Sequence, residues 1–376
     1  MTEKTRVLVL GAGFGGMELC TTLSEALGDA VAVTLIDKSD HFVFGYSKLD
    51  LMFGRTDAEA IRLPYRNFVK PGVRLLRETV LSIDPEARRV VTDAGTHDGD
   101  YLVVALGAEY DLDATPGLKQ ANEFYSVAGA EVLKDVLANF AGGKVVVGVC
   151  GAPFKCPPAP SECVLMLHDF LEKRGLRGKS DITLVIPFGV PIPPSPETSK
   201  ALLGEFASRN ITWVPQRRVA AVEPGRAMLD DGSALPFDLF LGVPKHRAPA
   251  AVEASGMAEG GWIPVKPRTL ETKYPNVFAV GDIANTGTPK AGLFAEGAAH
   301  AVAQSIVAAV RRSGEAGLYA GRGSCYLEFG GGRIGRVDVD FFSGPSPTGV
   351  YYEPSLQLRA GKEEFGASRK ARWFGI

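Results

Sequence analysis

Short apolar runs alternate with longer amphipathic segments along the 376 residues of this chain. The runs have the length and composition of buried strands, and they are "RVLVL" (6–10), "VAVTLID" (31–37), "YLVVALGA" (101–108), "GKVVVGVC" (143–150), "DITLVIPF" (181–188) and "NVFAV" (276–280). Segments with helical spacing follow several of them, at 17–23, 162–175 and 289–310. Buried strands that alternate with amphipathic helices predict parallel sheets covered by helices, which is the α/β class.

The first turn between a strand and a helix is rich in glycine. Gly11, Gly13 and Gly16 form the pattern G-x-G-x-x-G, and the second strand ends at Asp37. The first glycine allows a tight turn, the second lets the backbone approach a pyrophosphate, and the third lets the helix pack closely on the strand. The helix N-terminus then faces the phosphates, and the acid accepts ribose hydroxyls. We therefore predict a dinucleotide site here.

Two later strand ends extend this site. One strand reaches Gly107, and the strand at 276–280 is followed by Asp282, whose carboxylate suits a ribityl hydroxyl or a flavin phosphate. Together, "GAGFGG", "ALGA" and "VFAVGD" resemble the flavoproteins with two dinucleotide-binding domains of the disulfide reductase superfamily. The resemblance covers residues 1 to about 310. It implies that the first site binds FAD, with Asp282 at the flavin and Lys290 near its ring.

In that superfamily an inserted second domain binds NAD(P)H, and here its glycine turn is altered. The strand at 143–150 leads into "GAPFKCPPAP", where G-x-G-x-x-G would be expected. The prolines remove N–H donors that would hold a phosphate, and Phe154 and Lys155 add bulk. The strand at 181–188 lacks an acid at its end. We therefore expect no nicotinamide site, which separates this chain from the type II NADH dehydrogenases that it otherwise resembles.

A thiol takes the place of that second site. The segments "APFKCPPAPSE" around Cys156 and "GSCYLEFGGGRIGRVDVDF" around Cys325 resemble the redox-cysteine segments of two families. These are the sulfide:quinone oxidoreductases and the flavoprotein subunit of flavocytochrome c sulfide dehydrogenases. The resemblance implies a Cys156–Cys325 redox disulfide, with Cys325 nearer the flavin and Cys156 receiving sulfur, an order that the residues alone leave open. The position of Cys156 before a helix, beside Lys155, predicts a lowered thiol pKa.

Other residues near these segments qualify the resemblance. Glu162 matches an acid near the thiol in these families and could move a proton from hydrosulfide, although a carboxylate that merely caps the next helix, or lies in its first turn, is an equal alternative. Ser126 stands where many quinone-reducing members have a third cysteine. No cysteine follows the second strand, where flavocytochrome-type enzymes attach their cofactor, so FAD is expected to be non-covalent. His246 is expected to be a polar loop residue.

The remaining cysteines indicate no framework of disulfides and no metal site. The chain has five cysteines, an odd number, and we expect no secretory leader at its start. Cys20 and Cys163 are interpreted as small core residues, and Cys150 either as core or as an exchange partner for Cys156. No pair is spaced as C-x-x-C, and the five histidines are scattered, so we predict no bound metal.

Charge and hydropathy restrict the partners and the location. A formal charge of −2 gives no reason to expect nucleic acid as a partner. No apolar run reaches the length of a membrane span, about 20 residues, so we expect a cytoplasmic protein. The C-terminal tip is aromatic and basic, and its residues are Phe365, Arg369, Lys370, Arg372, Trp373 and Phe374. Such a tip suits either peripheral contact with the inner face of a membrane or docking on the protein itself.

These patterns predict two Rossmann-like (FAD/NAD(P)-binding type) domains, the second inserted in the first, with a C-terminal α+β segment. The expected limits are 1–108 with 240–315 for the FAD-binding domain, 109–239 for the inserted NAD-like domain and 316–376 for the C-terminal segment. The predicted function is FAD-dependent oxidation of sulfide, or of a small persulfide or thiol, with electrons passed to a quinone or another acceptor. Two alternatives stay open: an NADH dehydrogenase with a remodelled pocket, and a flavoprotein that senses redox state or transfers electrons without turnover.

Overall fold

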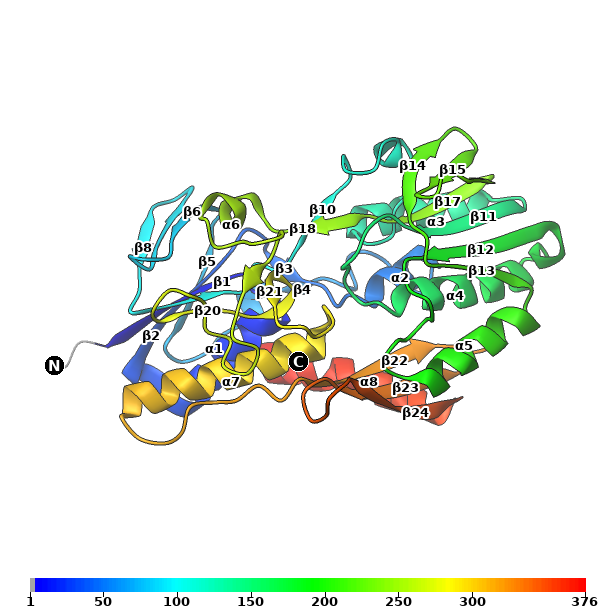
Figure 1. The fold of residues 1–376 in the computed structure, drawn as a ribbon. Helices are drawn as coiled ribbons and strands as arrows, with labels where there is room; N and C mark the ends of the chain where they lie inside the picture. The colour runs from blue at the N-terminus through cyan, green and yellow to red at the C-terminus, as the bar shows by residue number, and fades with distance from the viewer. Residues whose placement is uncertain (1–3) are drawn as a thin grey trace.

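The first domain is built on a five-stranded parallel sheet with the strand order β20-β9-β1-β2-β5. The computed structural model describes residues 4–376 (Figure 1). The strands of this sheet are β1 (Thr5–Leu10), β2 (Val31–Asp37), β5 (Val73–Arg77), β9 (Tyr101–Val104) and β20 (Val277–Ala279). Helices α1 (Phe14–Leu27) and α7 (Gly292–Arg311) pack together below the sheet in Figure 1. The apolar runs predicted a parallel sheet covered by helices, and this sheet is parallel with two helices on one face.

Alternation along β1 explains how this sheet is covered on both faces. Successive side chains of a strand point to opposite faces. Val7 and Val9 pack with residues of α1 and α7, while Leu8 and Leu10 join a second core. That second core lies against the antiparallel ribbon β6 (Val80–Asp84), β7 (Arg89–Thr92) and β8 (Thr96–Asp98) and the short helix α6 (Ala250–Ala254). Because both faces are buried, the strand is apolar at four successive positions, Val7 to Leu10.

The inserted domain has its own parallel sheet, with the order β13-β12-β11-β17. Its strands are β11 (Gly143–Val149), β12 (Ser180–Ile186), β13 (Ile211–Pro215) and β17 (Leu239–Val243). Its helices are α3 (Val127–Asn139), α4 (Ala159–Lys173) and α5 (Pro196–Ser208), and an antiparallel ribbon completes it with β14 (Val219–Glu223), β15 (Arg226–Leu229) and β16 (Ala234–Pro236). Pro160 lies in the first turn of α4, where no N–H donor is needed, and Pro158 is the N-cap.

Two short strands carry the chain between the domains. The run predicted as a strand at 101–108 ends as a strand at Val104, and a separate short strand, β10 (Glu109–Asp111), follows it. The chain returns through β18 (Lys245–Arg247), which pairs antiparallel with β10. Strand β20 then lies beside β9 in the first sheet. This strand order supports the predicted insertion, and the residue limits of the domains stay predictions.

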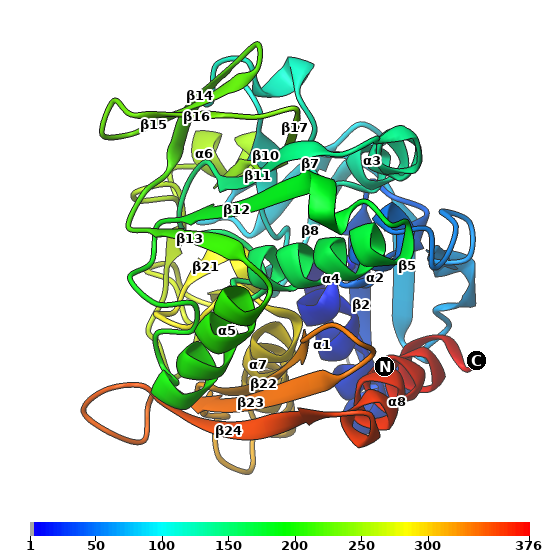
Figure 2. The same cartoon turned by 90° about the vertical axis from the view of Figure 1, so that its right-hand side faces the viewer.

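The C-terminal segment lies across both domains. Its antiparallel sheet consists of β22 (Arg322–Glu328), β23 (Ile334–Asp340) and β24 (Thr348–Ser355), and the chain ends with α8 (Gln357–Arg369) and a π-helical turn (Lys370–Phe374). Strand β22 contacts α7 of the first domain and α4 of the inserted domain. Figure 2 shows this sheet and α8 side by side under both domains. The segment therefore brings residue 325 to the junction between the two domains.

The aromatic and basic tip docks on the protein itself, which was one of the two alternatives. Trp373 is 1% exposed, and its Nε1 donates to Glu18 Oε2 at 2.7 Å. Arg372 forms ion pairs with Glu18 and Glu25 of α1. The rings of Phe14 and Phe42 lie edge-on to the indole. The tip is thus part of the core of the first domain.

One expectation about hydropathy was wrong. Among residues 4–376, α7 is a single helix that is long and apolar enough, by length and composition, to cross a membrane. Half of its apolar window is buried within the protein, and the helix packs against α1 and β22. Its alanines lie in the core because a helix of small residues allows this close approach. The helix therefore has a packing role that explains its composition.

We expect the Trp373→Ala substitution to lower the free energy of unfolding by about 3–5 kcal/mol, because it opens a cavity in a packed core and removes one of the donors to the buried carboxylate of Glu18. Urea unfolding of the FAD-bound protein measures this loss. Leu356→Ala is the matched control, since Leu356 is 67% exposed on the same segment. A loss no larger than that of the control would contradict the docking role of the tip.

Candidate functional site

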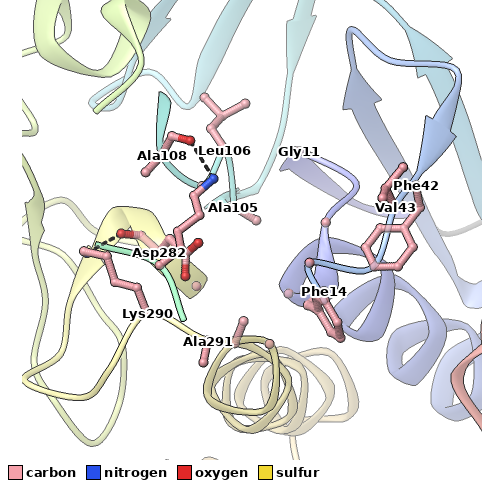
Figure 3. A pocket seen from close by; sticks show the side chains of 18 of the residues that line it. Gly11, Phe14, Phe42, Val43, Ala105, Leu106, Ala108, Asp282, Lys290 and Ala291 are labelled. Atoms are coloured by element: carbon pink, nitrogen blue, oxygen red, sulfur yellow. Dashed lines mark hydrogen bonds between the residues drawn. The ribbon is translucent and has the colours of Figure 1, made fainter. Parts of the chain in front are cut away.

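The predicted site residues meet at one cavity of about 940 Å³, lined by both domains and the C-terminal segment. Nine of the ten line it: Gly11, Gly13, Asp37, Gly107, Cys156, Glu162, Asp282, Lys290 and Cys325. Gly16 lies behind the cavity wall, where a Cβ would collide with the carbonyl of Gly11. In Figure 3, Gly11 and Phe14 lie across an open space from Asp282 and Lys290. The fold therefore gathers residues from distant parts of the chain.

The glycine turn leaves room for a ligand. Gly11 has a φ of +98°, and a Cβ there would collide with the carbonyl of Ala105, so the tight turn needs glycine. Packing within the protein does not require glycine at position 13, because a Cβ there would find no protein atom within 4 Å. Since Gly13 lines the cavity, the free space in front of its backbone fits the close approach of a pyrophosphate.

Asp37 closes the adenosine end of this space. Its Oδ2 accepts the N–H of Ala12 at 2.7 Å and its Oδ1 the N–H of Ser39 at 2.8 Å. Burial raises the pKa of this carboxyl, and the two N–H donors oppose that effect. Each oxygen keeps a second lone pair, which suits ribose hydroxyls. The glycine turn, Asp37 and Asp282 together fit FAD.

Lys290 places a positive charge in the opposite wall. It is 8% exposed, its Nζ lies 3.6 Å from the centroid of the Trp262 ring, and it donates to the backbone carbonyl of Asp282. Burial lowers its pKa to about 8, against the attraction of Asp282. A desolvated ammonium in the wall would favour an anionic ligand group beside it.

Cys156 and Cys325 border the same cavity from different elements. Cys156 lies in the loop before α4 and Cys325 on β22, and both are half-buried. The expected low pKa of Cys156 was wrong: burial raises it well above the usual range, and the charges of Glu162 and Cys325 add to this. The ammonium of Lys155 turns away and donates to the carbonyl of Ala108 at 2.8 Å, so it does not lie against the thiol. Burial also raises the pKa of Cys325, to about 12.

Glu162 lines the same cavity and is 4% exposed, and its charge raises the pKa of both thiols. Glu162 stands in the first turn of α4, as the alternative expected, but it does not cap the helix. Its Oε1 accepts the N–H of Glu328 at 3.0 Å, so this bond joins α4 to β22. Burial raises its pKa to about 7, and the nearby charge of Lys362 opposes that rise. A carboxyl that titrates near neutral pH beside two thiols can exchange protons with them.

The structure adds residues that the sequence did not single out. Lys362 of α8 lines the cavity, and its Nζ donates to Glu328 Oε1 at 2.6 Å. No motif could have indicated it, because it stands in a charged helix far along the chain. His246 was expected in a polar loop, and that was wrong. It lies on β18 and is 4% exposed, because the strand that pairs with β10 passes through the domain junction.

The other three cysteines are core residues. Cys20 and Cys163 are fully buried, and burial raises the pKa of each thiol. Cys150 is 8% exposed at the end of β11, where it packs with Val146 and Val219, so the core alternative holds. Its pKa is raised to about 12 by burial. None of the three has the position of a redox partner.

The turn after β11 is filled by its own side chains. Phe154 is 1% exposed and stacks on Phe188, with ring centroids 5.6 Å apart. A Cβ at Gly151 would meet the side chain of Lys245. The space that a phosphate would need in front of this turn is therefore taken by protein atoms, which fits the expected loss of the nicotinamide site.

We expect Gly13→Ala to weaken FAD binding about 10- to 100-fold, because the new methyl group would crowd the pyrophosphate. Titration of the apoprotein with FAD, followed by flavin fluorescence, measures the affinity. Gly204→Ala is the control, since Gly204 lies on α5 with no atom near its Cβ position and away from the cavity. Equal FAD affinity in both variants would argue against this binding mode.

The chain is similar to known oxidoreductases over most of its length. The chain is 26% identical to the mitochondrial sulfide:quinone oxidoreductase of Mus musculus, over 91% of this chain and 79% of that protein. The crystal structure of the sulfide:quinone oxidoreductase from Aquifex aeolicus superposes with a TM-score of 0.87 and 26% identity, covering 98% of this chain and 91% of that one. The type II NADH:quinone oxidoreductase of Staphylococcus saprophyticus is 28% identical, with 74% of each chain covered.

These similarities confirm the resemblance that the sequence motifs indicated, the fold of two dinucleotide-binding domains and FAD as the cofactor. The family model for pyridine nucleotide-disulphide oxidoreductases matches residues 5–311. The chain therefore belongs to the pyridine nucleotide-disulphide oxidoreductase family, and it is an FAD-dependent oxidoreductase.

Proposed function

We propose that this protein oxidises hydrosulfide through a Cys156–Cys325 disulfide and passes the electrons through FAD to a quinone. The observation that carries the proposal is the arrangement of Cys156, Cys325 and Glu162 on the wall of one cavity that also holds the FAD-binding residues. The similarity to sulfide:quinone oxidoreductases supports the choice of substrates. FAD, when bound, would supply a two-electron acceptor in this cavity.

The sulfur chemistry needs an electrophile and a base. In the oxidised protein, hydrosulfide would attack the Sγ of Cys156, form a new sulfur–sulfur bond there and break the bond to Cys325. Cys156 would then carry a persulfide, and Cys325 would be released as a thiolate with the electron pair of the broken bond. Burial disfavours this thiolate. The proposed step therefore requires a strong acceptor close to Cys325, which the shared cavity allows.

Glu162 would take the proton that the attacking sulfur loses. Its carboxyl is buried beside both thiols, and burial raises its pKa to about 7. The carboxylate is therefore a strong enough base to accept a proton, and the acid is weak enough to release it at neutral pH. The link to Glu328 and Lys362 holds the carboxyl in place while its charge changes.

An aromatic end of the cavity suits the quinone. Tyr46, Tyr326 and Phe365 line this end together with Lys362. Tyr46 and Phe365 meet edge to face, with ring centroids 6.3 Å apart. A flat ring would pack against such side chains, and Lys362 has N–H donors beyond the one used by Glu328. Donors of this kind would pair with a quinone carbonyl.

Anaerobic mixing separates this proposal from its rivals. We expect sulfide to bleach the flavin absorbance and NADH to leave it unchanged, because the turn after β11 is filled. Reduction by NADH would favour the dehydrogenase alternative. Continued sulfide oxidation with a soluble quinone is expected as well, and its absence would favour a flavoprotein that does not turn over.

We expect Cys156→Ser and Cys325→Ser each to slow flavin bleaching by sulfide about 1000-fold or more, because neither variant can form the disulfide that hydrosulfide attacks. Stopped-flow absorbance measures the rate. Cys20→Ala is the matched control, since Cys20 is buried away from the cavity on α1. Wild-type rates in Cys156→Ser would refute the proposed route.

We expect the bleaching rate at fixed hydrosulfide concentration to fall tenfold per pH unit below about pH 7, because protonation of Glu162 removes the base. Glu162→Gln should lose this dependence and react about 100- to 10,000-fold more slowly above that pH. Hydrogen sulfide titrates near neutral pH too, so both proteins are compared at matched hydrosulfide. An unchanged pH profile in Glu162→Gln would contradict the assignment.

A further inference from the structure

The two residues Lys155 and Cys156 are held by hydrogen bonds from several parts of the fold. The N–H of Cys156 donates to the carbonyl of Lys290 at 2.8 Å, and the N–H of Ala159 donates to the carbonyl of Cys156 at 2.9 Å. Tyr125 Oη donates to the carbonyl of Lys155 at 3.0 Å. The N–H of Lys155 donates to His246 Nε2 at 3.2 Å. Every backbone donor and acceptor of this dipeptide therefore has a partner.

This backbone needs such anchors because of its conformation. Cys156 has a φ of +48°, in the left-handed region that side chains other than glycine rarely adopt. A residue of this kind keeps its conformation only when the surroundings fix it. The thiol direction thus depends on the bonds around it and not on the local sequence.

His246 lies where the two domains join. It pairs with Tyr110 across the two connecting strands β10 and β18. Its ring meets those of Tyr110 and Tyr125 edge to face, with centroids 5.0 Å and 5.5 Å away. Its Nδ1 lies 2.8 Å from the carbonyl of Pro244, which can only accept. The ring therefore carries its proton on Nδ1, and Nε2 presents a lone pair to Lys155.

We propose that His246 is the positioning residue that holds Cys156 at the cavity wall, through the bond between its Nε2 and the N–H of Lys155. This inference rests on the proposed role of Cys156 as the thiol that receives sulfur. Because His246 belongs to a connecting strand, the bond ties the position of the thiol to the relative placement of the two domains.

The electrostatic surroundings keep the ring neutral. Burial lowers the pKa of His246 to about 3, and the charges of Lys155, Lys48 and Lys290 act in the same direction. The other polar rings that face it, Tyr110 and Tyr125, are both engaged as donors to backbone carbonyls. A protonated ring could not accept the N–H of Lys155, so a neutral ring is required for this role.

The matched pair His246→Gln and His246→Asn tests the inference in the FAD-bound enzyme. The amide of Gln reaches the position of Nε2, and that of Asn reaches only Nδ1. We expect His246→Asn to speed both amide hydrogen exchange at Lys155 and alkylation of reduced Cys156 by iodoacetamide about 5- to 10-fold, the effect of losing one hydrogen bond. His246→Gln should stay near wild type, as should His300→Phe on the exposed face of α7.

Kinetics add a readout of function. In His246→Asn the rate of flavin bleaching at saturating sulfide should fall by a similar factor, and the sulfide concentration for half-maximal rate should stay nearly unchanged. Equal exchange and alkylation rates in His246→Asn and His246→Gln would overturn the inference. If sulfide still bleached the flavin of Cys156→Ser at the wild-type rate, the proposed function would be wrong. The exchange and alkylation rates would then still test the role of His246.

A second measurement needs no substitution. The ¹⁵N resonance of His246 Nε2 should have the shift of an unprotonated ring nitrogen at neutral pH. A protonated Nε2 would overturn the inference even if His246→Asn did not fold.

Discussion

The backbone bond between Cys156 and Lys290 is the contact on which the candidate site depends. It joins the loop before α4, in the inserted domain, to the loop before α7, in the FAD-binding domain. It brings the thiol of the inserted domain to the residues of the first domain that line the same cavity. Cys325 completes the arrangement, because β22 packs against both α4 and α7. The chemistry proposed here is therefore a property of the domain junction.

Burial dominates the electrostatics of this junction. It raises the pKa of Cys156, Cys325 and Glu162 and lowers that of Lys290, so each group is shifted toward its neutral form. A reactive thiol is usually ionised before it binds its substrate, and the raised pKa values of Cys156 and Cys325 disfavour this. The raised thiol pKa values favour instead a disulfide that reacts with an external nucleophile, with an acid nearby that titrates near neutral pH. The same burial makes the neutral form of His246 available as an acceptor.

The C-terminal segment contributes more to the site than its sequence suggests. It supplies Cys325 from β22 and Lys362 from α8, and it is held in place by the docked tip. The tip places the indole of Trp373 beside Phe14, a residue of the glycine turn that also lines the cavity. Packing at the end of the chain and the shape of the FAD-binding cavity are thus physically linked.

The sequence by itself determined the features that depend on neighbouring residues. Gly11 and Gly16 are required by a turn and a close contact, and the unbroken apolar run of Val7, Leu8 and Val9 indicates a strand buried on both faces. The two-domain α/β fold and the FAD cofactor follow from such patterns, together with the resemblance they carry. Only the tertiary structure decided the raised pKa of Cys156, the burial of His246 and the place of Lys362 in the cavity. These properties depend on which side chains surround a group, and on how little water reaches it, once distant segments pack together. The residues adjacent to that group in the sequence do not determine this.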